Sequence, residues 1–267
     1  YDDSPNLFYT TTEALRLSAL PNAPTIVVAS TELQSFPPNI LFDGCEFIGR
    51  KQPVASVPSL AWLQGSYERN WIGDGRLVAR ISTAEGDEDV ATLSLLAQRL
   101  EEPFVTNGFA VDTGPVIPTD FAGSTLEVLT AHGGINSEGR YFQVVSDEGV
   151  LTVSAADLAA AVHNVGIVVL FVCSGGRADK HPTANTTLGL AKQILNRGCS
   201  AVIASPWPLI SQVPPHWLPE FLNFWKQNAT LMEAVHKANM AVDQRFALDS
   251  ACGLAMTVYG SPLLKRR

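Results

Sequence analysis

The most regular stretch of the sequence is the run Gly166-Ile-Val-Val-Leu-Phe-Val-Cys173, which is followed at once by Ser174-Gly175-Gly176. The run is apolar on both faces of an extended strand and rich in β-branched residues. Such a strand is typical of the centre of a parallel sheet that is covered by helices on both sides. The run is far shorter than the ~18 apolar residues that cross a bilayer, so it predicts a core strand and no membrane span.

Short apolar strands and segments of helical period alternate on both sides of this run. That order predicts right-handed crossovers and an α/β fold, with a mostly parallel central sheet and helices on both faces. Two proline-rich stretches, residues 34–58 and 205–219, are expected to be loops. The expected strands are 25–30, 76–81, 125–131, 167–173, 201–205 and 256–259, and the expected helices are 90–100, 187–197 and one that starts at the N-cap Ser154.

Composition narrows the possible functions. The chain has 267 residues, 46% of them apolar, and 18 Lys and Arg against 26 Asp and Glu, which gives a net charge of −8. A nucleic-acid binder needs a clustered basic face, and the sequence has no basic block beyond residues 265–267. The apolar content predicts a globular protein with a large core, and the length fits one large domain or two smaller ones.

The beginning of the chain and its cysteines indicate where the protein works. The sequence opens with Tyr-Asp-Asp-Ser, without an initiator Met or a leader, so we expect it to be cut from a longer polypeptide. The cysteines are widely spaced, which is typical of free thiols and not of disulfides or a zinc site. Free thiols indicate a reducing compartment, so we expect a cytoplasmic location. The four cysteines are Cys45, Cys173, Cys199 and Cys252.

Two predicted strands end in residues that can carry chemistry. Strand 125–131 runs into His132-Gly133-Gly134, and strand 167–173 ends at Cys173, 41 residues later, a separation that suits one βαβ unit. If the two strands are parallel neighbours, both ends lie at one edge of the sheet, where α/β proteins place their active sites. A thiol facing an imidazole makes a nucleophile with its acid/base partner. The adjacent glycines let a substrate approach backbone N–H donors.

Each of these features has an ordinary explanation when it is taken alone. A cysteine at the end of a buried strand commonly serves as a small core residue, and His-Gly after a strand commonly forms a turn. Ser174-Gly175-Gly176 is also compatible with a phosphate-binding nest. Other catalytic motifs are missing, because the sequence has neither a G-x-x-x-x-G-K-[ST] loop nor a G-x-S-x-G elbow.

Five sequence blocks, taken together and in order, resemble the CHAT domain, a family of caspase-like cysteine peptidases related to separase and the caspases. The similarity is short-range within each block, and the block order extends over roughly residues 20–262. The blocks are Pro58-Ser-Leu60, Leu129-Thr-Ala-His-Gly133, Leu170-Phe-Val-Cys-Ser-Gly-Gly176, Gly189-Leu-Ala191 with Arg197–Trp207, and Tyr259-Gly-Ser-Pro262.

The resemblance implies a caspase-like three-layer sandwich formed by a single domain over residues 1–267. It implies that Cys173 is the nucleophile and His132 the general acid/base, and that the N–H groups of Gly133 and Cys173 form the oxyanion hole. No metal or organic cofactor is implied. The implied partners are a protein substrate and a regulatory domain or protein, often of helical repeats, while we expect no bound nucleic acid and no membrane.

Substrate specificity does not transfer from the family to this sequence. Relatives that cleave after basic residues often carry an acidic residue two positions before the cysteine, and that position here is Phe171. Arg177 follows the cysteine and can pair with an acidic substrate side chain, although exposed loop cations are commonly solvated. Glu127, inside the strand before the histidine, is either a pocket wall or an edge charge.

Three functions therefore stay open at this stage. The first is an intracellular cysteine endopeptidase, the second a catalytically silent interaction module of the same fold, and the third a phosphate- or nucleotide-binding domain that uses residues 174–176. For the peptidase we expect control by a partner or a fused regulatory region that acts on the loop 174–186, although an ordinary connecting loop is the alternative.

Overall fold

The central strands are buried along their whole length, as the sequence predicts. In the computed structural model β9 (Ile167–Val172), β12 (Ala201–Ala204) and β4 (Leu77–Ile81) have no exposed residue. The structure describes residues 12–16, 20, 22–28, 36–68, 71–72, 75–81, 88–113, 124–136, 139–146, 149–162, 164–173, 175–177, 179–180, 187–246 and 250–266.

Strands and helices alternate along most of this part of the chain. The other strands are β1 (Thr25–Val28), β2 (Val54–Val57), β3 (Trp71–Ile72), β5 (Ala110–Thr113), β6 (Leu126–Asn136), β7 (Gly139–Ser146), β8 (Gly149–Val153), β10 (Asp179–Lys180), β11 (Thr187–Leu188), β13 (Thr257–Gly260) and β14 (Lys265–Arg266). The helices are η2 (Pro38–Ile40), α2 (Ile48–Lys51), α3 (Leu60–Glu68), α4 (Glu88–Thr106), α5 (Ala155–Ala161), α6 (Leu190–Asn196), α7 (Val213–Lys226), α8 (Leu231–Arg245) and α9 (Ser250–Gly253).

The main sheet consists of two parallel blocks that meet in an antiparallel pair. Its order is β1-β2-β13-β12-β9-β6-β4-β5, with β7 and β8 attached to β6. The strands from β12 to β5 all run in one direction, and β13, β2 and β1 run in the other. The predicted arrangement, in which β6 and β9 are parallel neighbours and β12 lies next beyond β9, is confirmed.

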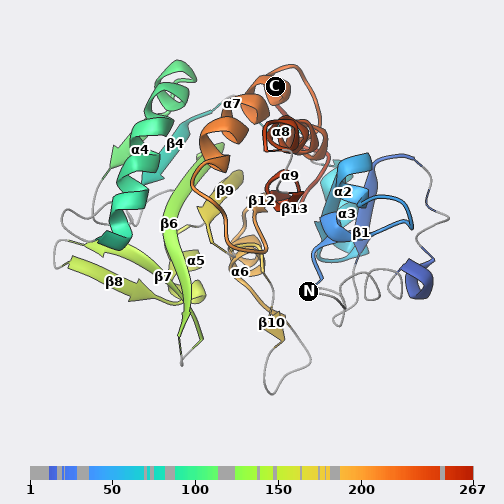
Figure 1. Cartoon of the computed structure of the whole chain (residues 1–267), viewed down its shortest axis with the longest axis horizontal. Helices are drawn as coiled ribbons and strands as arrows, with labels where there is room; N and C mark the ends of the chain where they lie inside the picture. Colours follow the sequence, from blue (N-terminus) through green and yellow to red (C-terminus); the bar gives the residue numbers. More distant parts are fainter. Residues whose placement is uncertain are drawn as a thin grey trace.

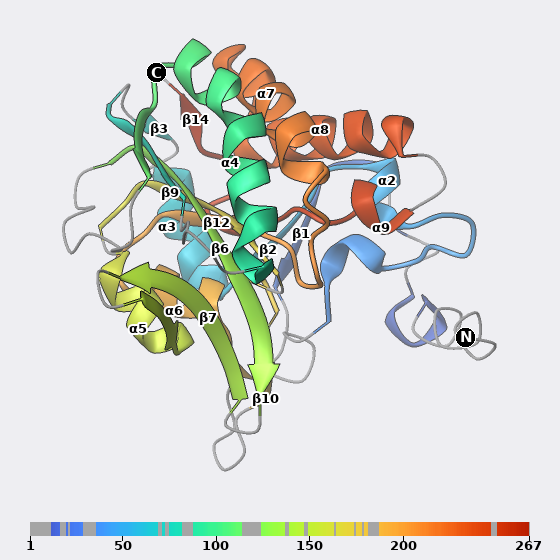
Figure 2. The same cartoon turned by 60° about the vertical axis from the view of Figure 1, so that its left-hand side comes forward.

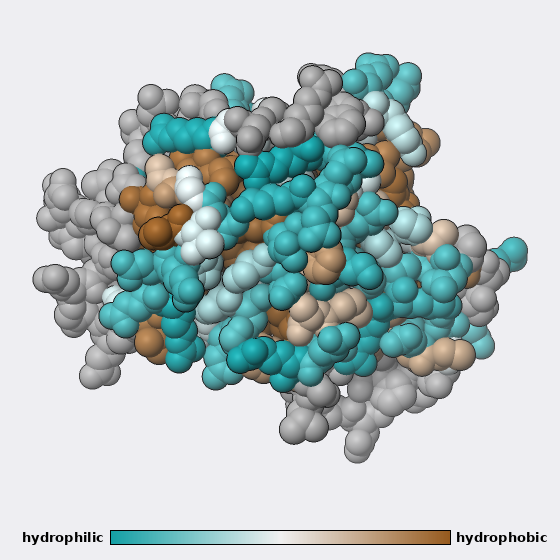
Figure 3. Space-filling view, turned by 90° about the horizontal axis from the view of Figure 1, so that it is seen from above, coloured by the Kyte–Doolittle hydropathy of each residue, from teal (hydrophilic) through white to brown (hydrophobic). Residues whose placement is uncertain are grey.

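Helices cover both faces of this sheet (Figure 1). Apolar side chains of α4, α7 and α8 form one core with one face of the strands, and those of α5 and α6 form a second core with the other face. Turned by 60°, the same two groups of helices are seen apart, with the sheet between them (Figure 2). Seen from above, the molecular surface is mostly hydrophilic with small apolar patches (Figure 3). The two groups of helices, with the sheet between them, confirm the predicted three-layer sandwich.

Strand β6 is longer than predicted, and this corrects the expected place of the histidine. The strand does not stop at Ala131 but continues through His132 and two glycines to Asn136, where it pairs with β7 in a hairpin. His132 lies opposite Gln143 of β7. Glycines are uncommon in strands, yet pairing with β7 holds Gly133 and Gly134 in the extended conformation. His132 is therefore a strand residue and not a loop residue.

The stretch 205–219 is only partly the loop that its prolines indicate. Helix α7 begins at Val213, and Pro214 occupies its first turn, where the missing N–H has no intrahelical partner in any case. Trp217, Phe221 and Trp225 follow at four-residue spacing, and their rings stack in the core. The burial of these rings outweighs the hydrogen bond that Pro219 removes inside the helix.

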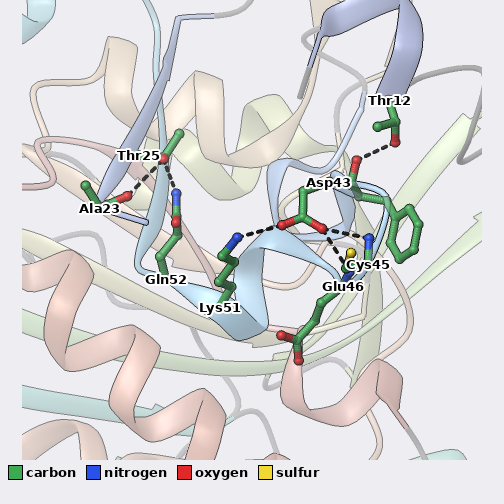
Figure 4. A network of polar contacts seen from close by, with 9 residues as sticks. Thr12, Ala23, Thr25, Asp43, Cys45, Glu46, Lys51 and Gln52 are labelled. Carbon is green, nitrogen blue, oxygen red and sulfur yellow. Dashed lines mark hydrogen bonds and ion pairs between the residues drawn. The ribbon is translucent and has the colours of Figure 1, made fainter. Parts of the chain in front are cut away.

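Residues 36–58, the described part of the stretch 34–58, are not the loop that their prolines indicate. They contain η2, α2 and β2, and a polar network fixes them (Figure 4). The carboxylate of Asp43 accepts hydrogen bonds from the backbone N–H groups of Cys45 and Glu46 and from Lys51 Nζ, at 2.8–2.9 Å. These donors lower the pKa of Asp43 to about 2. Gln52 also donates to Thr25, which connects this segment to β1.

Two buried asparagines hold the chain segment that leads from α9 into β13. Asn39 Nδ2 lies 2.9 Å from Leu254 O and 3.1 Å from Met256 O. Asn239 of α8 donates to Met256 O at 2.8 Å and accepts the indole N–H of Trp217 at 2.8 Å. Since unpaired backbone groups are costly inside a protein, these bonds fix the position of α9 against α7 and α8.

The N-cap predicted at Ser154 is confirmed. Ser154 caps α5 in a capping box with Asp157, in which each side chain bonds the other residue's backbone N–H. Gly198 follows α6 with a φ of +96°, a left-handed conformation that glycine adopts without strain.

Candidate functional site

The register of β6 against β9 places His132 and Cys173 side by side. The paired residues run from Leu126 opposite Ile167 to Ala131 opposite Val172, and the next residue on each strand is His132 or Cys173. Neighbouring strands are about 4.8 Å apart, so the backbones of these two residues are adjacent. Both side chains are half-buried.

Strand alternation sends both side chains to the same face of the sheet. Ala131 and Val172 contribute to the core under α5 and α6. Because successive residues of a strand point to opposite faces, His132 and Cys173 lie on the face that carries α4, α7 and α8. The Cys173 thiol agrees with this, since its S–H donates to the carbonyl of Leu209, a residue that packs against that same core.

The contact between the thiol and Leu209 is the hydrogen bond that the structure gives to the Cys173 side chain. The Sγ–O distance is 3.8 Å. Among the described residues, the structure shows no hydrogen bond between the thiol and His132. Leu209 belongs to the segment 205–212, which follows β12. The thiol therefore lies between two neighbours, His132 within the adjacent strand β6 and Leu209 beyond the end of the adjacent strand β12.

Gly133 lets β6 approach the cysteine closely. A Cβ atom at this position would lie 2.6 Å from the carbonyl oxygen of Cys173 and 3.1 Å from a methyl group of Val172. Those distances are shorter than van der Waals contact, so any side chain would push β6 away from Cys173. Position 133 is therefore a glycine because the backbone of Cys173 is so close, and not because the chain turns there.

The glycines after the cysteine form a turn whose N–H groups are already used. Gly175 N–H donates to Val172 O at 3.1 Å, and Gly176 N–H donates to Ser205 O at 2.8 Å. Gly176 also packs against the ring of Tyr259, where a Cβ would lie 2.8 Å from a ring carbon. These two groups are therefore not free to bind a phosphate, which weakens the nest interpretation. Most of the loop 174–186 lies outside the described residues.

The other predicted binding residues are not gathered around the thiol. Phe171 is buried, with its ring 6.0 Å from that of Trp217 in an edge-to-face contact. Arg177 is exposed and lines a cavity of about 60 Å³ together with Tyr259 and residues of α6. Glu127 lies five residues before His132 along β6, about 16 Å away at the usual rise of a strand.

Glu127 is an unusual buried acid. Its side chain is 0% exposed, and neither carboxylate oxygen has a hydrogen-bond partner within the part of the chain that the structure describes. Burial raises the pKa of Glu127 to about 8, although the positive charges of Arg80 and Arg76 lower it. Burial, with a smaller contribution from the charge of Glu127, also raises the pKa of the Cys199 thiol to about 11, which makes that cysteine a poor nucleophile.

Sequence reasoning assigned no role to the residues beside the thiol on the β12 side. Leu209 and Trp207 belong to the segment after β12, whose prolines were interpreted as a loop. The signal that could have found them was the predicted position of β12 next to β9, because parallel neighbours bring their carboxyl ends to one edge.

The described residues contain no group of three His, Cys, Asp or Glu side chains that could hold a metal ion. None of the helices in that part of the chain is long and apolar enough to cross a membrane.

Comparison with solved structures identifies the class of fold. The chain is similar to separase of Saccharomyces cerevisiae in its complex with securin, with a TM-score of 0.62, 15% identity and coverage of 91% of this chain but 16% of the separase chain. A second structure of that complex gives a TM-score of 0.63, 17% identity and 91% and 15% coverage. The Arg-specific cysteine proteinase gingipain R gives a TM-score of 0.50, 17% identity and 81% and 56% coverage. The chain thus has the fold of caspase-like cysteine peptidases, and it spans a small part of separase and about half of gingipain R.

Sequence comparison finds a match to one family model. The family model of the CHAT domain matches residues 128–249, which include most of β6 and all of β9, β12, α7 and α8. The resemblance to the CHAT domain is therefore confirmed. No curated protein sequence matches the chain.

Replacement of Glu127 by Gln should change how stability depends on pH. In the unfolded chain this carboxyl titrates near 4.5, whereas in the folded protein it stays protonated up to about pH 8. The unfolded state therefore releases its proton first, and the free energy of unfolding falls as pH rises from about 4.5 to 8. We expect Glu127→Gln to remove this loss, worth roughly 3–5 kcal/mol above pH 8, as measured by urea unfolding at pH 5 and pH 9.

Glu101→Gln, at an exposed position of α4, is the matched control and should leave the pH dependence as it is. Equal pH profiles for the wild type and Glu127→Gln would show that the Glu127 carboxyl is not held neutral in the fold.

Proposed function

We propose that this chain is the catalytic domain of a cysteine endopeptidase, with Cys173 as nucleophile and His132 as general acid and base. The observation that carries the proposal is the β6–β9 register, because His132 and Cys173 each follow its last pair, Ala131 opposite Val172, and lie on one face of the sheet. Gly133, in contact with the main chain of Cys173, supports it. Fold similarity to separase and gingipain R agrees with this chemistry but does not by itself establish activity.

The reaction follows from these groups. The Cys173 thiol gives its proton to His132, and the thiolate attacks the carbonyl carbon of the scissile peptide bond. The backbone N–H groups of Gly133 and Cys173 bind the oxyanion of the tetrahedral intermediate. The imidazolium then protonates the leaving amine, the C–N bond breaks, and a thioester remains. Water attacks the thioester while His132 takes up a proton, and the returned proton restores the thiol as the acid product leaves.

One observation favours the alternative of a catalytically silent module. The thiol donates its hydrogen bond to the Leu209 carbonyl, so the side chain of Cys173 has to turn toward His132 before the proton can move. Rotation about one side-chain bond of a half-buried residue occurs on the ps–ns timescale when neighbours permit it. Under our proposal substrate binding favours that rotation, whereas in a silent module the thiol stays on Leu209.

Cys173→Ala and His132→Ala should each abolish peptide-bond cleavage, by about 10³-fold or more, because a nucleophile and its base act as a unit. Cleavage of a peptide mixture prepared from a cell lysate, followed by mass spectrometry, measures this without knowledge of the substrate. Cys45→Ala, which replaces an exposed thiol outside the site, is the matched control and should keep full activity. Wild-type rates in either dyad variant would reject the assignment.

Gly133→Ala should reduce cleavage strongly while the chain still folds. The added methyl group would lie 2.6 Å from Cys173 O, so β6 and the cysteine backbone have to separate. We expect a destabilisation of about 1–3 kcal/mol by overpacking and a loss of activity on the order of 100-fold from the displaced oxyanion donors. Gly65→Ala in α3, where the new methyl meets nothing within 4 Å, is the control. Unchanged activity in Gly133→Ala would argue against a role of the Gly133 N–H.

We also propose that the natural polypeptide or a partner protein controls this site, in a reducing compartment such as the cytoplasm. All four cysteines are free thiols, and the Cys173 thiol donates its hydrogen bond to Leu209 O and not to His132. The similar separase structures contain securin as a partner, and the chain corresponds to 16% of that enzyme. By analogy, a protein substrate and a regulatory region, of helical repeats or another fold, would be the partners here.

Control of this kind should appear as a change in the reactivity of Cys173. We expect the cleavage rate and the iodoacetamide alkylation rate at Cys173 to rise at least about 10-fold when the neighbouring region or partner is added, with changed hydrogen-exchange protection of residues 174–186. Full activity of the 267-residue chain alone, with constant protection of that loop, would exclude gating through it.

A further inference from the structure

A small apolar cavity lies between the segment that follows β12 and helix α9. Its volume is about 50 Å³. Its floor consists of the buried residues Val213, Cys252 and Ala255, and its rim consists of the exposed residues Pro208, Ile210 and Ala251. Trp207 and Leu209 complete the lining, which contains no charged residue. The cavity therefore opens to solvent but offers apolar walls.

Leu209 connects this cavity to the proposed nucleophile. Its carbonyl oxygen is 3.8 Å from Cys173 Sγ, and the same residue lines the cavity. A peptide that lies extended across the thiol advances about 3.3 Å per residue. A side chain within about three residues of the scissile bond would therefore reach the cavity.

The walls of the cavity are held in place from both sides. Trp207 is fixed to α9 by its indole N–H, which donates to Ala251 O at 3.3 Å. Its backbone is fixed at the end of β12, because Ser205 Oγ donates to Trp207 O at 2.8 Å. The far end of the segment enters α7 through a bond from Val213 N–H to Ile210 O at 3.0 Å. A wall fixed at three points is preformed, as binding pockets usually are.

The volume and polarity of the cavity determine which substrate side chain it can bind. A charged side chain would lose its hydration there without a partner, which is costly. About 10–15 Å³ of cavity holds one water molecule, so this cavity has room for a few methyl-sized groups and not for a large aromatic ring. A branched aliphatic side chain such as that of Leu or Val fits both limits.

We infer that this cavity, lined by Trp207, Leu209, Ile210 and α9, is a substrate subsite that selects an aliphatic side chain close to the scissile bond. The inference rests on the proposed function, because it assigns the substrate class of the same site. Burial of one aliphatic side chain corresponds to a preference of about 10–100-fold in kcat/KM over an acidic side chain at that position.

The test uses two substitutions of exposed rim residues, which should not disturb folding. Ala251→Leu fills the mouth of the cavity, and Ile210→Asp places a charge on its rim, where Ile210 is 45% exposed. The matched controls are Ala61→Leu and Leu60→Asp, which alter exposed positions of α3, a helix that packs with the opposite core. Iodoacetamide alkylation of Cys173 should be the same in all four variants, which shows that the thiol itself is intact.

Two readouts separate the subsite from the catalysis. The first is cleavage of acetylated hexapeptide libraries in which Leu, Asp or Lys is fixed at one position. The second is binding of the same libraries to Cys173→Ala, which needs no catalysis. We expect one position at which Leu exceeds Asp and Lys by about 10-fold or more. That preference should disappear in Ala251→Leu and Ile210→Asp but persist in the controls.

Each combination of results is informative. Cleavage without an aliphatic preference, or with a preference that both rim variants retain, overturns the subsite and leaves the peptidase intact. Binding with a preference that the rim variants remove, in a chain that cleaves nothing, supports the subsite and overturns the peptidase. Absence of both cleavage and selective binding overturns both.

Discussion

The parallel pairing of β6 with β9 is the constraint on which the rest of the molecule depends. Both strands are buried between two layers of helices, so their alternating side chains must match a core on each face. A slip by one residue would turn the apolar set of β6 to the wrong face and would separate His132 from Cys173. The packing that stabilises the fold therefore also sets the geometry of the candidate dyad, without any contact specific to the two residues.

The position of β9 inside the sheet gives the thiol two different neighbours. The sheet order β12-β9-β6 places Cys173 between the segment after β12 and His132 on β6. One neighbour supplies a base and the other a carbonyl acceptor together with an apolar wall. The segment 205–212 begins at the end of β12, which pairs with β13, and it ends at the start of α7. Both of its ends are therefore fixed. Substrate selection and nucleophile placement thus share one short segment.

The sequence predicted the centre of the sheet and the edge at which the site lies, because the apolar runs 125–131 and 167–173 are local signals and the β6–β9 pairing ends within one residue of the ends of these runs. It missed features that depend on distant partners. The glycines after His132 look like a turn until β7 pairs with them, and the prolines of α7 look like a loop until its aromatic rings meet a core. The capping box Thr230-Leu-Met-Glu233 of α8 was a local signal that could have been recognised.

The continuation of β6 past β9 changes how the candidate base is held. At His132 the strand exchanges its main-sheet partners for β7, where Gln143 lies opposite. A histidine on a free loop would have to order its backbone as well as its ring before each reaction, at a cost of about 1–2 kcal/mol per residue. In a paired strand the backbone of the histidine is already ordered, so only the rotations of its side chain cost conformational entropy. The hairpin β6–β7 is therefore part of the catalytic architecture under our proposal, because it preorganises the imidazole next to the thiol.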